Sequence, residues 1–123
     1  MPGKSDELIK KKCLPCEGGV PPLTKEKVAE YLQDLKDWSL SADGKSIRAE
    51  YQMKNFVEAI SLMDKIAPVA EEEDHHPDFH LTGYRKLAIE LSTHAIGGLS
   101  ENDFILAAKI DRIPKNLKSA PKK

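Results

Sequence analysis

The 123-residue sequence predicts an α+β domain: a four-stranded antiparallel sheet with about three helices packed on one face, in the order α-β-β-α-β-β-α. Three observations carry this prediction. Apolar residues recur at helical spacing over 55–72, apolar and polar residues alternate over 84–93, and Asp43-Gly44 is a tight-turn signal between two short alternating stretches. Hairpins joined by helices favour an antiparallel sheet with its helices together on one side.

The first half of the chain predicts one helix and one hairpin. Thr24 is a residue type that caps helix N-termini, and apolar residues follow it at helical spacing, which predicts a helix over 25–37. Trp38 and Leu40 alternate with polar neighbours before the turn. Three alternating apolar residues come after it: Ile47, Ala49 and Tyr51.

The middle of the chain predicts the longest helix and a short strand. Asn55 with Glu58 resembles a capping box, and the helix that it starts, over 55–72, has the strongest amphipathic pattern in the sequence. Pro77 disfavours helix at the residue before it. A short strand is therefore expected near 79–81.

The last elements are a long strand and a helix. The strand is predicted over 84–93, and Gly97-Gly98 ends it. Ser100 then caps a final helix that has Asp103 in its first turn. The globular domain runs over 23–113, between a polar leader (1–22) that contains a C-x-x-C motif and a Lys-rich tail (114–123).

Composition excludes two classes of function. Nineteen Lys and Arg against twenty Asp and Glu give a net charge of −1, which argues against a nucleic-acid binder that works by bulk electrostatics. No apolar run approaches the roughly 20 residues that span a bilayer, so a membrane protein is excluded. The N-terminus lacks the apolar stretch of a secretory signal. We therefore expect a cytoplasmic protein, with a short organelle peptide as the alternative.

Residues 71–77 concentrate acidic side chains around His75 and His76 at a predicted helix end. Imidazole has an unperturbed pKa of about 6.5, so it can both accept and donate a proton near neutrality. The alternative is a solvated acidic helix end with two surface histidines. Ser92-Thr93-His94 lies where the long strand ends, and a strand that returns beside the helix end could bring all three imidazoles to one pocket.

Metal binding is a competing interpretation. Cys13-x-x-Cys16 and the two adjacent histidines could be assembled into a zinc site, yet no Cys or His spacing completes a four-ligand pattern. A redox role for the cysteines is weak, because they lie in the leader and not at a βα junction. His80 is predicted to be a surface strand residue without a role.

Several motifs together point to one family: Glu71-x-x-Asp74-His75-His76-Pro77, Tyr84, Ser92-Thr93-His94 and Gly98-Leu99-Ser100-x-x-Asp103. They resemble the signature of the pterin-4a-carbinolamine dehydratases. The similarity spans about 24–112 and includes Asn55-Phe56-x-x-Ala59, while the C-x-x-C leader resembles that of plant-type members.

The resemblance implies a lyase of tetrahydropterin recycling. Such enzymes remove water from 4a-hydroxytetrahydropterin and release quinonoid dihydropterin, using general acid and base groups and neither a metal nor an organic cofactor. The resemblance implies that His75, His76 and His94 are catalytic. His75 and His94 are the acid and base candidates, in an order that the resemblance leaves open, while His76 binds and polarises the pterin. It also implies further substrate-binding or supporting residues, which are Glu71, Asp74, Phe79, Ser92, Thr93, Ala95 and Asp103.

The sequence departs from the family pattern in two places. Phe79 stands where Trp is common, and the stretch between Phe79 and Tyr84 is one residue longer than usual, which affects the expected local strand register. The resemblance implies a homodimer or homotetramer, while the composition leads us to expect no direct nucleic-acid binding and no membrane. Animal members also act as dimerisation cofactors for a transcription factor. A protein-binding module without essential catalysis is thus the alternative, although the intact set of three histidines favours an enzyme.

Overall fold

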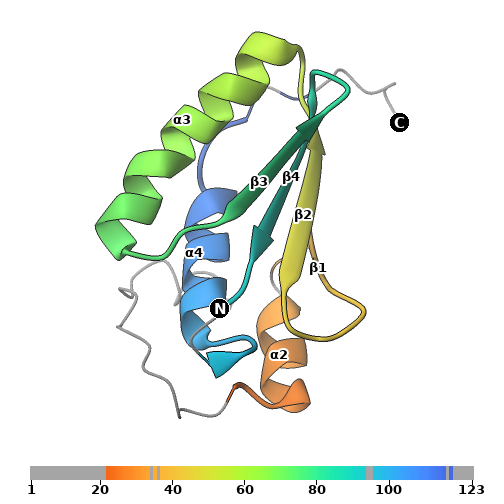
Figure 1. Cartoon of the computed structure of the whole chain (residues 1–123), viewed down its shortest axis with the longest axis vertical. Helices are drawn as coiled ribbons and strands as arrows, with labels where there is room; N and C mark the ends of the chain where they lie inside the picture. Colours follow the sequence, from red (N-terminus) through yellow and green to blue (C-terminus); the bar gives the residue numbers. More distant parts are fainter. Residues whose placement is uncertain (1–21, 34, 36, 94–95, 116, 118–123) are drawn as a thin grey trace.

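The computed structural model describes residues 22–33, 35, 37–93, 96–115 and 117, which form three helices and a four-stranded sheet (Figure 1). These elements follow one another in the predicted order, α-β-β-α-β-β-α. The elements are α2 (Lys25–Leu32), β1 (Trp38–Leu40), β2 (Ile47–Gln52), α3 (Phe56–Glu73), β3 (Asp78–Thr82), β4 (Lys86–Leu91) and α4 (Glu101–Asp111).

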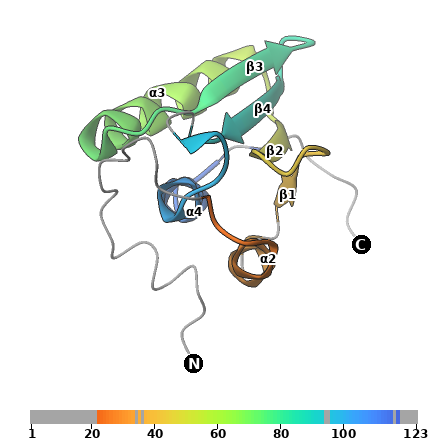
Figure 2. The same ribbon diagram turned by 60° about the horizontal axis from the view of Figure 1, so that its bottom comes forward.

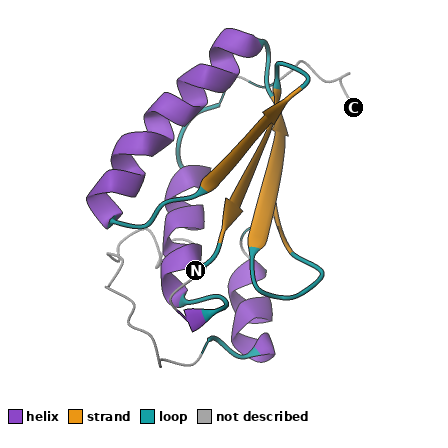
Figure 3. Ribbon diagram, in the orientation of Figure 1, coloured by secondary structure: helices purple, strands orange, loops and turns teal. Residues whose placement is uncertain are grey.

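The sheet has the strand order β1-β2-β4-β3, and every neighbouring pair is antiparallel. Figures 2 and 3 show all three helices on the same side of it, as predicted. Alternate residues of β2 and β4 face these helices and are buried opposite one another, for example Ala49 and Ile89. The other face is charged, and there Arg48 Nη1 donates to Glu90 Oε2 at 2.8 Å. Among the described residues, no helix is long and apolar enough to cross a membrane.

Helix α3 starts and ends close to the predicted positions because its cap residues are clear in the sequence. Asn55 Oδ1 accepts a hydrogen bond from the Glu58 backbone N–H at 2.9 Å. The helix then runs to Glu73, one residue beyond the predicted end. Its inward face packs into the core through Ala59, Leu62, Ile66 and Ala70.

The first helix is shorter than predicted. It ends at Leu32 with Gln33 as its C-cap, although the apolar pattern continues to Leu35 and Trp38. Both of these residues are buried, Leu35 completely. The prediction of a helix over 25–37 was wrong at its end because Leu35 enters the core from the connection before β1 and not from a helix.

The long strand is also shorter than predicted. Strand β4 begins at Lys86, because Gly83 and Tyr84 adopt φ values of 53° and 57° and form the turn after β3. The additional residue in this stretch does not disturb the ladder, since Thr82 pairs directly with Lys86. At the other end β4 stops at Leu91, and Thr93 makes only an isolated bridge with Gly98.

A buried hydroxyl on β2 leads to a first testable prediction. The Tyr51 hydroxyl oxygen is buried and makes no hydrogen bond of good geometry among the described residues, although the Asp111 carboxylate lies near enough to interact with it. Burial raises its pKa above the ordinary value of 10.0, and the charges of Asp111 and Asp37 raise the pKa further. Above pH 10 the unfolded chain therefore releases a proton that the folded protein keeps, so this group lowers stability as pH rises.

We expect Tyr51→Phe to stabilise the protein by about 1 kcal/mol at pH 7, because an unsatisfied buried hydroxyl is removed. The gain should be larger at pH 10.5, since the variant no longer has this proton linkage. Urea unfolding of both proteins at the two pH values measures the difference. An equal gain at both pH values would contradict the titration argument, and a loss at pH 7 would show that the hydroxyl is satisfied in solution.

Candidate active site at the end of helix α3

The two adjacent histidines are held by a tight turn at the C-terminus of α3. Asp74 is the C-cap and adopts a left-handed conformation with φ 53°. The backbone N–H groups of Asp74 and His75 both donate to the Ala70 carbonyl, the second at 3.1 Å. His75 and His76 are therefore fixed to the last turn of the helix, and Pro77 leads directly into β3.

His75 is the more enclosed of the two and pairs with a carboxylate from α4. Its Nε2 lies 2.6 Å from Asp103 Oδ1, and the exposed fractions of the two side chains are 12% and 0%. Asp103 lies in the first turn of α4, where negative charge is favoured by the helix dipole. The sequence separation is 28 residues, so the pair exists only through tertiary packing.

Asp103 also holds the strand end and the start of its own helix. Its Oδ2 accepts from Thr93 Oγ1 at 2.8 Å and from the Ser100 backbone N–H at 3.0 Å. Because both of these groups donate, the carboxylate acts as an acceptor, and His75 Nε2 is then the donor in the third bond. In the neutral ring of His75 the Nδ1 atom is left unprotonated and can accept a proton.

His76 pairs with a different carboxylate, and this second pair is exposed to solvent. Its Nε2 lies 2.6 Å from Glu71 Oε2, in the preceding turn of α3. The two side chains are 55% and 75% exposed, so water and salt screen this interaction. The adjacent histidines thus differ: one is enclosed and tied to a buried carboxylate, while the other lies in solvent.

The loop after β4 closes on itself beside these residues. Thr93 N–H donates to the Gly98 carbonyl at 2.9 Å, and Ile96 N–H donates to the Thr93 carbonyl at 3.2 Å. His94 and Ala95, which the sequence predicts to be site residues, lie outside the described residues. The structure therefore fixes the two ends of the loop that carries His94.

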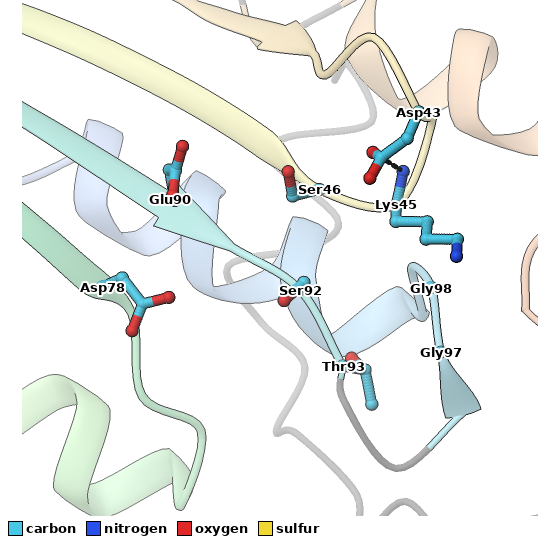
Figure 4. A pocket seen from close by; sticks show the side chains of 9 residues that line it. All are labelled: Asp43, Lys45, Ser46, Asp78, Glu90, Ser92, Thr93, Gly97 and Gly98. Atoms are coloured by element: carbon cyan, nitrogen blue, oxygen red, sulfur yellow. Dashed lines mark hydrogen bonds between the residues drawn. The ribbon is translucent and has the colours of Figure 1, made fainter.

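A cavity of about 330 Å³ opens beside this loop (Figure 4). Ser92 and Thr93 lie at its centre, with Asp78 and Glu90 on one side and the Lys45 turn on the other. Thr93 connects the cavity to the histidine turn, because its hydroxyl donates to the carboxylate that holds His75. The full lining is Asp43, Lys45, Ser46, Asp78, Glu90, Ser92, Thr93, Gly97 and Gly98.

A family model described as pterin 4 alpha carbinolamine dehydratase matches residues 21–113, which is most of the chain. The chain belongs to this family. A dehydratase-named relative from Nitrosomonas europaea is 48% identical over 111 residues, covering 89% of this chain and 96% of the relative. A Nitrosospira multiformis relative with the same family name is 46% identical over 108 residues, covering 88% and 93%.

Two other similarities extend the comparison to a plant and to a solved structure. A pterin-4-alpha-carbinolamine dehydratase of Arabidopsis thaliana, named as mitochondrial, is 40% identical over 110 residues, covering 87% of this chain and 59% of the relative. A crystal structure titled transcriptional coactivator/pterin dehydratase, from Brucella melitensis, has a TM-score of 0.69 at 30% identity. That match covers 73% of this chain and 95% of the other.

The structure brings together only some of the residues that the dehydratase resemblance suggested. His75, Thr93 and Asp103 form one hydrogen-bonded chain, and Ser92 lines the adjoining cavity. Phe79 instead packs partly against the hydrophobic core, opposite Ile89. The Asp74 backbone caps α3, and its side chain is exposed.

Sequence reasoning missed other polar residues near this candidate site. Asp78 and Glu90 line the cavity from facing positions on β3 and β4, a placement that only the strand register reveals. Glu73 is buried and bonded to Lys109, which lies 36 residues further along the chain. No local pattern signals such a pair.

The structure bears on two other interpretations of the sequence, which concern His80 and metal binding. His80 is exposed on β3, and its Nε2 lies 3.2 Å from Glu90 Oε1, as expected for a surface strand residue. Within the described residues, no group of three His, Cys, Asp or Glu side chains could hold a metal ion. Cys13 and Cys16 lie outside the described residues.

Proposed function

We propose that this chain dehydrates 4a-hydroxytetrahydropterin to quinonoid dihydropterin by histidine acid–base catalysis, as a step of tetrahydropterin recycling. Membership of the dehydratase family supports the reaction class. The observation that carries the assignment to this site is the enclosed His75 held by Asp103, whose carboxylate accepts a hydrogen bond from Thr93 in the lining of a cavity of about 330 Å³. That volume lies at the small end of the range for small-molecule pockets, about 300–1,000 Å³.

The reaction needs two proton transfers. The bond between C4a and its hydroxyl oxygen breaks, the oxygen takes a proton and leaves as water, and a ring nitrogen loses its proton as the carbon–nitrogen double bond forms. Overall, the substrate loses one water molecule and no electrons are exchanged with another reagent. An acid and a base near neutral pKa serve these transfers best, and imidazole can do both.

His75 is the best supported of the three proposed catalytic residues. With Nε2 donating to Asp103, the unprotonated Nδ1 of the neutral ring is the atom that would take a proton. The Asp103 carboxylate would then stabilise the imidazolium that results. We assign the complementary proton transfer to His94 and the polarisation of the pterin to His76, whose ring is steadied by Glu71.

The remaining residues of the proposed site would bind the pterin or support the histidines. In this proposal the hydrogen-bonding edge of the pterin contacts Ser92, Thr93 and the backbone near Ala95. Asp74 and Phe79 are the other proposed residues that bind the pterin or support the histidines. For the chain as a whole we propose a catalytic domain over 23–113 and a cytoplasmic location. A homodimer or homotetramer agrees with the exposed apolar side chains at the start of α3, such as Phe56 and Val57, which are 51% and 70% exposed.

The loss of 4a-hydroxytetrahydropterin absorbance tests this proposal. We expect the wild-type protein to accelerate dehydration, and His75→Ala to lower kcat about 10²–10⁴-fold, because a positioned acid–base group is removed. His76→Ala and His94→Ala should also lose activity. Lys65→Ala is the control, since this exposed side chain on α3 lines neither the cavity nor the histidine turn, and its kcat should not change.

Circular dichroism would establish that each variant is folded before its rate is interpreted. A folded wild-type protein that leaves the spontaneous rate unchanged would overturn the enzyme proposal and turn attention to the protein-binding alternative. A folded His75→Ala variant with full activity would leave the reaction standing and remove His75 from the mechanism.

A further inference from the structure

An ion pair between the buried Glu73 carboxylate and the partly buried Lys109 ammonium joins the end of α3 to α4. Lys109 Nζ donates to Glu73 Oε2, and the exposed fractions of the two side chains are 19% and 2%. Glu73 is the last residue of α3, and Lys109 lies in the last turn of α4. Burial of two charges costs several kcal/mol of solvation for each, so such a pair is weak evidence for stability alone.

The position of this pair relates it to the site. His75 follows Glu73 by two residues, and its backbone N–H is bonded to the Ala70 carbonyl within the last turn of α3. The same two elements are joined again where His75 meets Asp103. Figures 1 and 2 show the C-terminal half of α3 lying beside α4. Any tilt of the α3 end relative to α4 would therefore move the imidazole away from Asp103.

We propose that the Glu73–Lys109 ion pair is a positioning device that holds the end of α3 against α4 and so keeps His75 aligned with Asp103. The expected effect on rate rests on the proposed function, whereas the alignment of His75 with Asp103 does not. Hydrogen bonds weaken steeply with misalignment, and a displacement of about 1 Å can cost about 10²-fold in rate. Glu73 and Lys109 are thus positioning residues that act through His75.

Three variants separate alignment from stability. Lys109→Met keeps the apolar stem and removes the cation, so the buried Glu73 carboxylate no longer has Lys109 as a partner. Lys109→Arg restores a cation and is the rescue. Glu73→Gln combined with Lys109→Met removes both charges, so the buried side chain that has lost Lys109 is no longer charged and the charged link is not restored. Lys27→Met is the matched control, because it breaks an exposed ion pair with Glu30 on α2.

We expect Lys109→Met to lower kcat about 10- to 100-fold while KM changes less than about threefold. Lys109→Arg should return within about threefold of wild type, and Lys27→Met should match wild type. The double variant should unfold at a higher temperature than Lys109→Met yet keep the reduced kcat. If Lys109→Met does not fold, the double variant and Lys109→Arg still give this comparison.

The imidazole resonances of His75 give a second readout that does not depend on activity. They should shift in Lys109→Met and in the double variant, while those of His80, on the other face of the sheet, stay in place. Recovery of both kcat and the His75 resonances in the double variant would overturn the proposal, since packing alone would then align the ring. A wild-type protein without dehydratase activity would overturn the proposed function, while shifted His75 resonances would still support the alignment.

Discussion

Asp103→Asn should lower kcat about 10²–10⁴-fold while the protein remains folded. The wild-type carboxylate accepts three hydrogen bonds, from His75, Thr93 and the Ser100 backbone. An amide of the same shape has only one oxygen, so one or more of these donors would face an NH₂ group. If that donor is His75, the ring must change tautomer, and the imidazolium loses its stabilising charge.

Steady-state kinetics of Asp103→Asn beside Asp64→Asn measures this effect. Asp64 is an exposed residue of α3, so the same carboxylate-to-amide change there should leave kcat within about twofold of wild type. The unfolding free energy of Asp103→Asn should fall by about 1–3 kcal/mol, because a buried donor is left unsatisfied. A folded Asp103→Asn variant that keeps a third of wild-type kcat would show that Asp103 supports the structure and not the reaction.

The parts of the fold that were predictable from the sequence are those with local signals. The start of α3 follows from Asn55 and its bond to the Glu58 backbone, and the Asp43-Gly44 turn closes the hairpin, with Gly44 at φ 73°. The end of the first helix was not predictable, because Leu35 fits the helical spacing but is buried from a loop. Tyr84 likewise fits an alternating strand, yet its positive φ places it in a turn.

The candidate site, like the fold, has features that were predictable from the sequence and features that were not. The concentration of acids and imidazoles over 71–77 is visible in the sequence because those groups are neighbours in the chain. The difference between His75 and His76 is not visible, since it depends on which side of the turn meets α4. Lys109 gives no local signal for the same reason, as its partner lies 36 residues away.

Phe104→Ala should lower the unfolding free energy by about 3–5 kcal/mol. Phe104 is completely buried, and its ring stacks on Tyr31 of α2 with centroids 5.0 Å apart. Truncation loses the transfer free energy of the ring and leaves a cavity that the surroundings only partly fill. A domain of this size is typically stable by only about 5–15 kcal/mol, so the loss is a large share of the total.

Leu40→Ala is the control, because that side chain is 42% exposed on the edge strand β1 and its loss should change stability by less than about 1 kcal/mol. Urea unfolding of the three proteins with an unchanged m-value would measure both effects. A cost below about 1.5 kcal/mol for Phe104→Ala would show that the core closes around the missing ring. Phe104 directly follows Asp103, so the turn of α4 that places the ring in the core also places the carboxylate against His75. At a temperature where all three proteins are folded, kcat should therefore fall in Phe104→Ala and stay unchanged in Leu40→Ala.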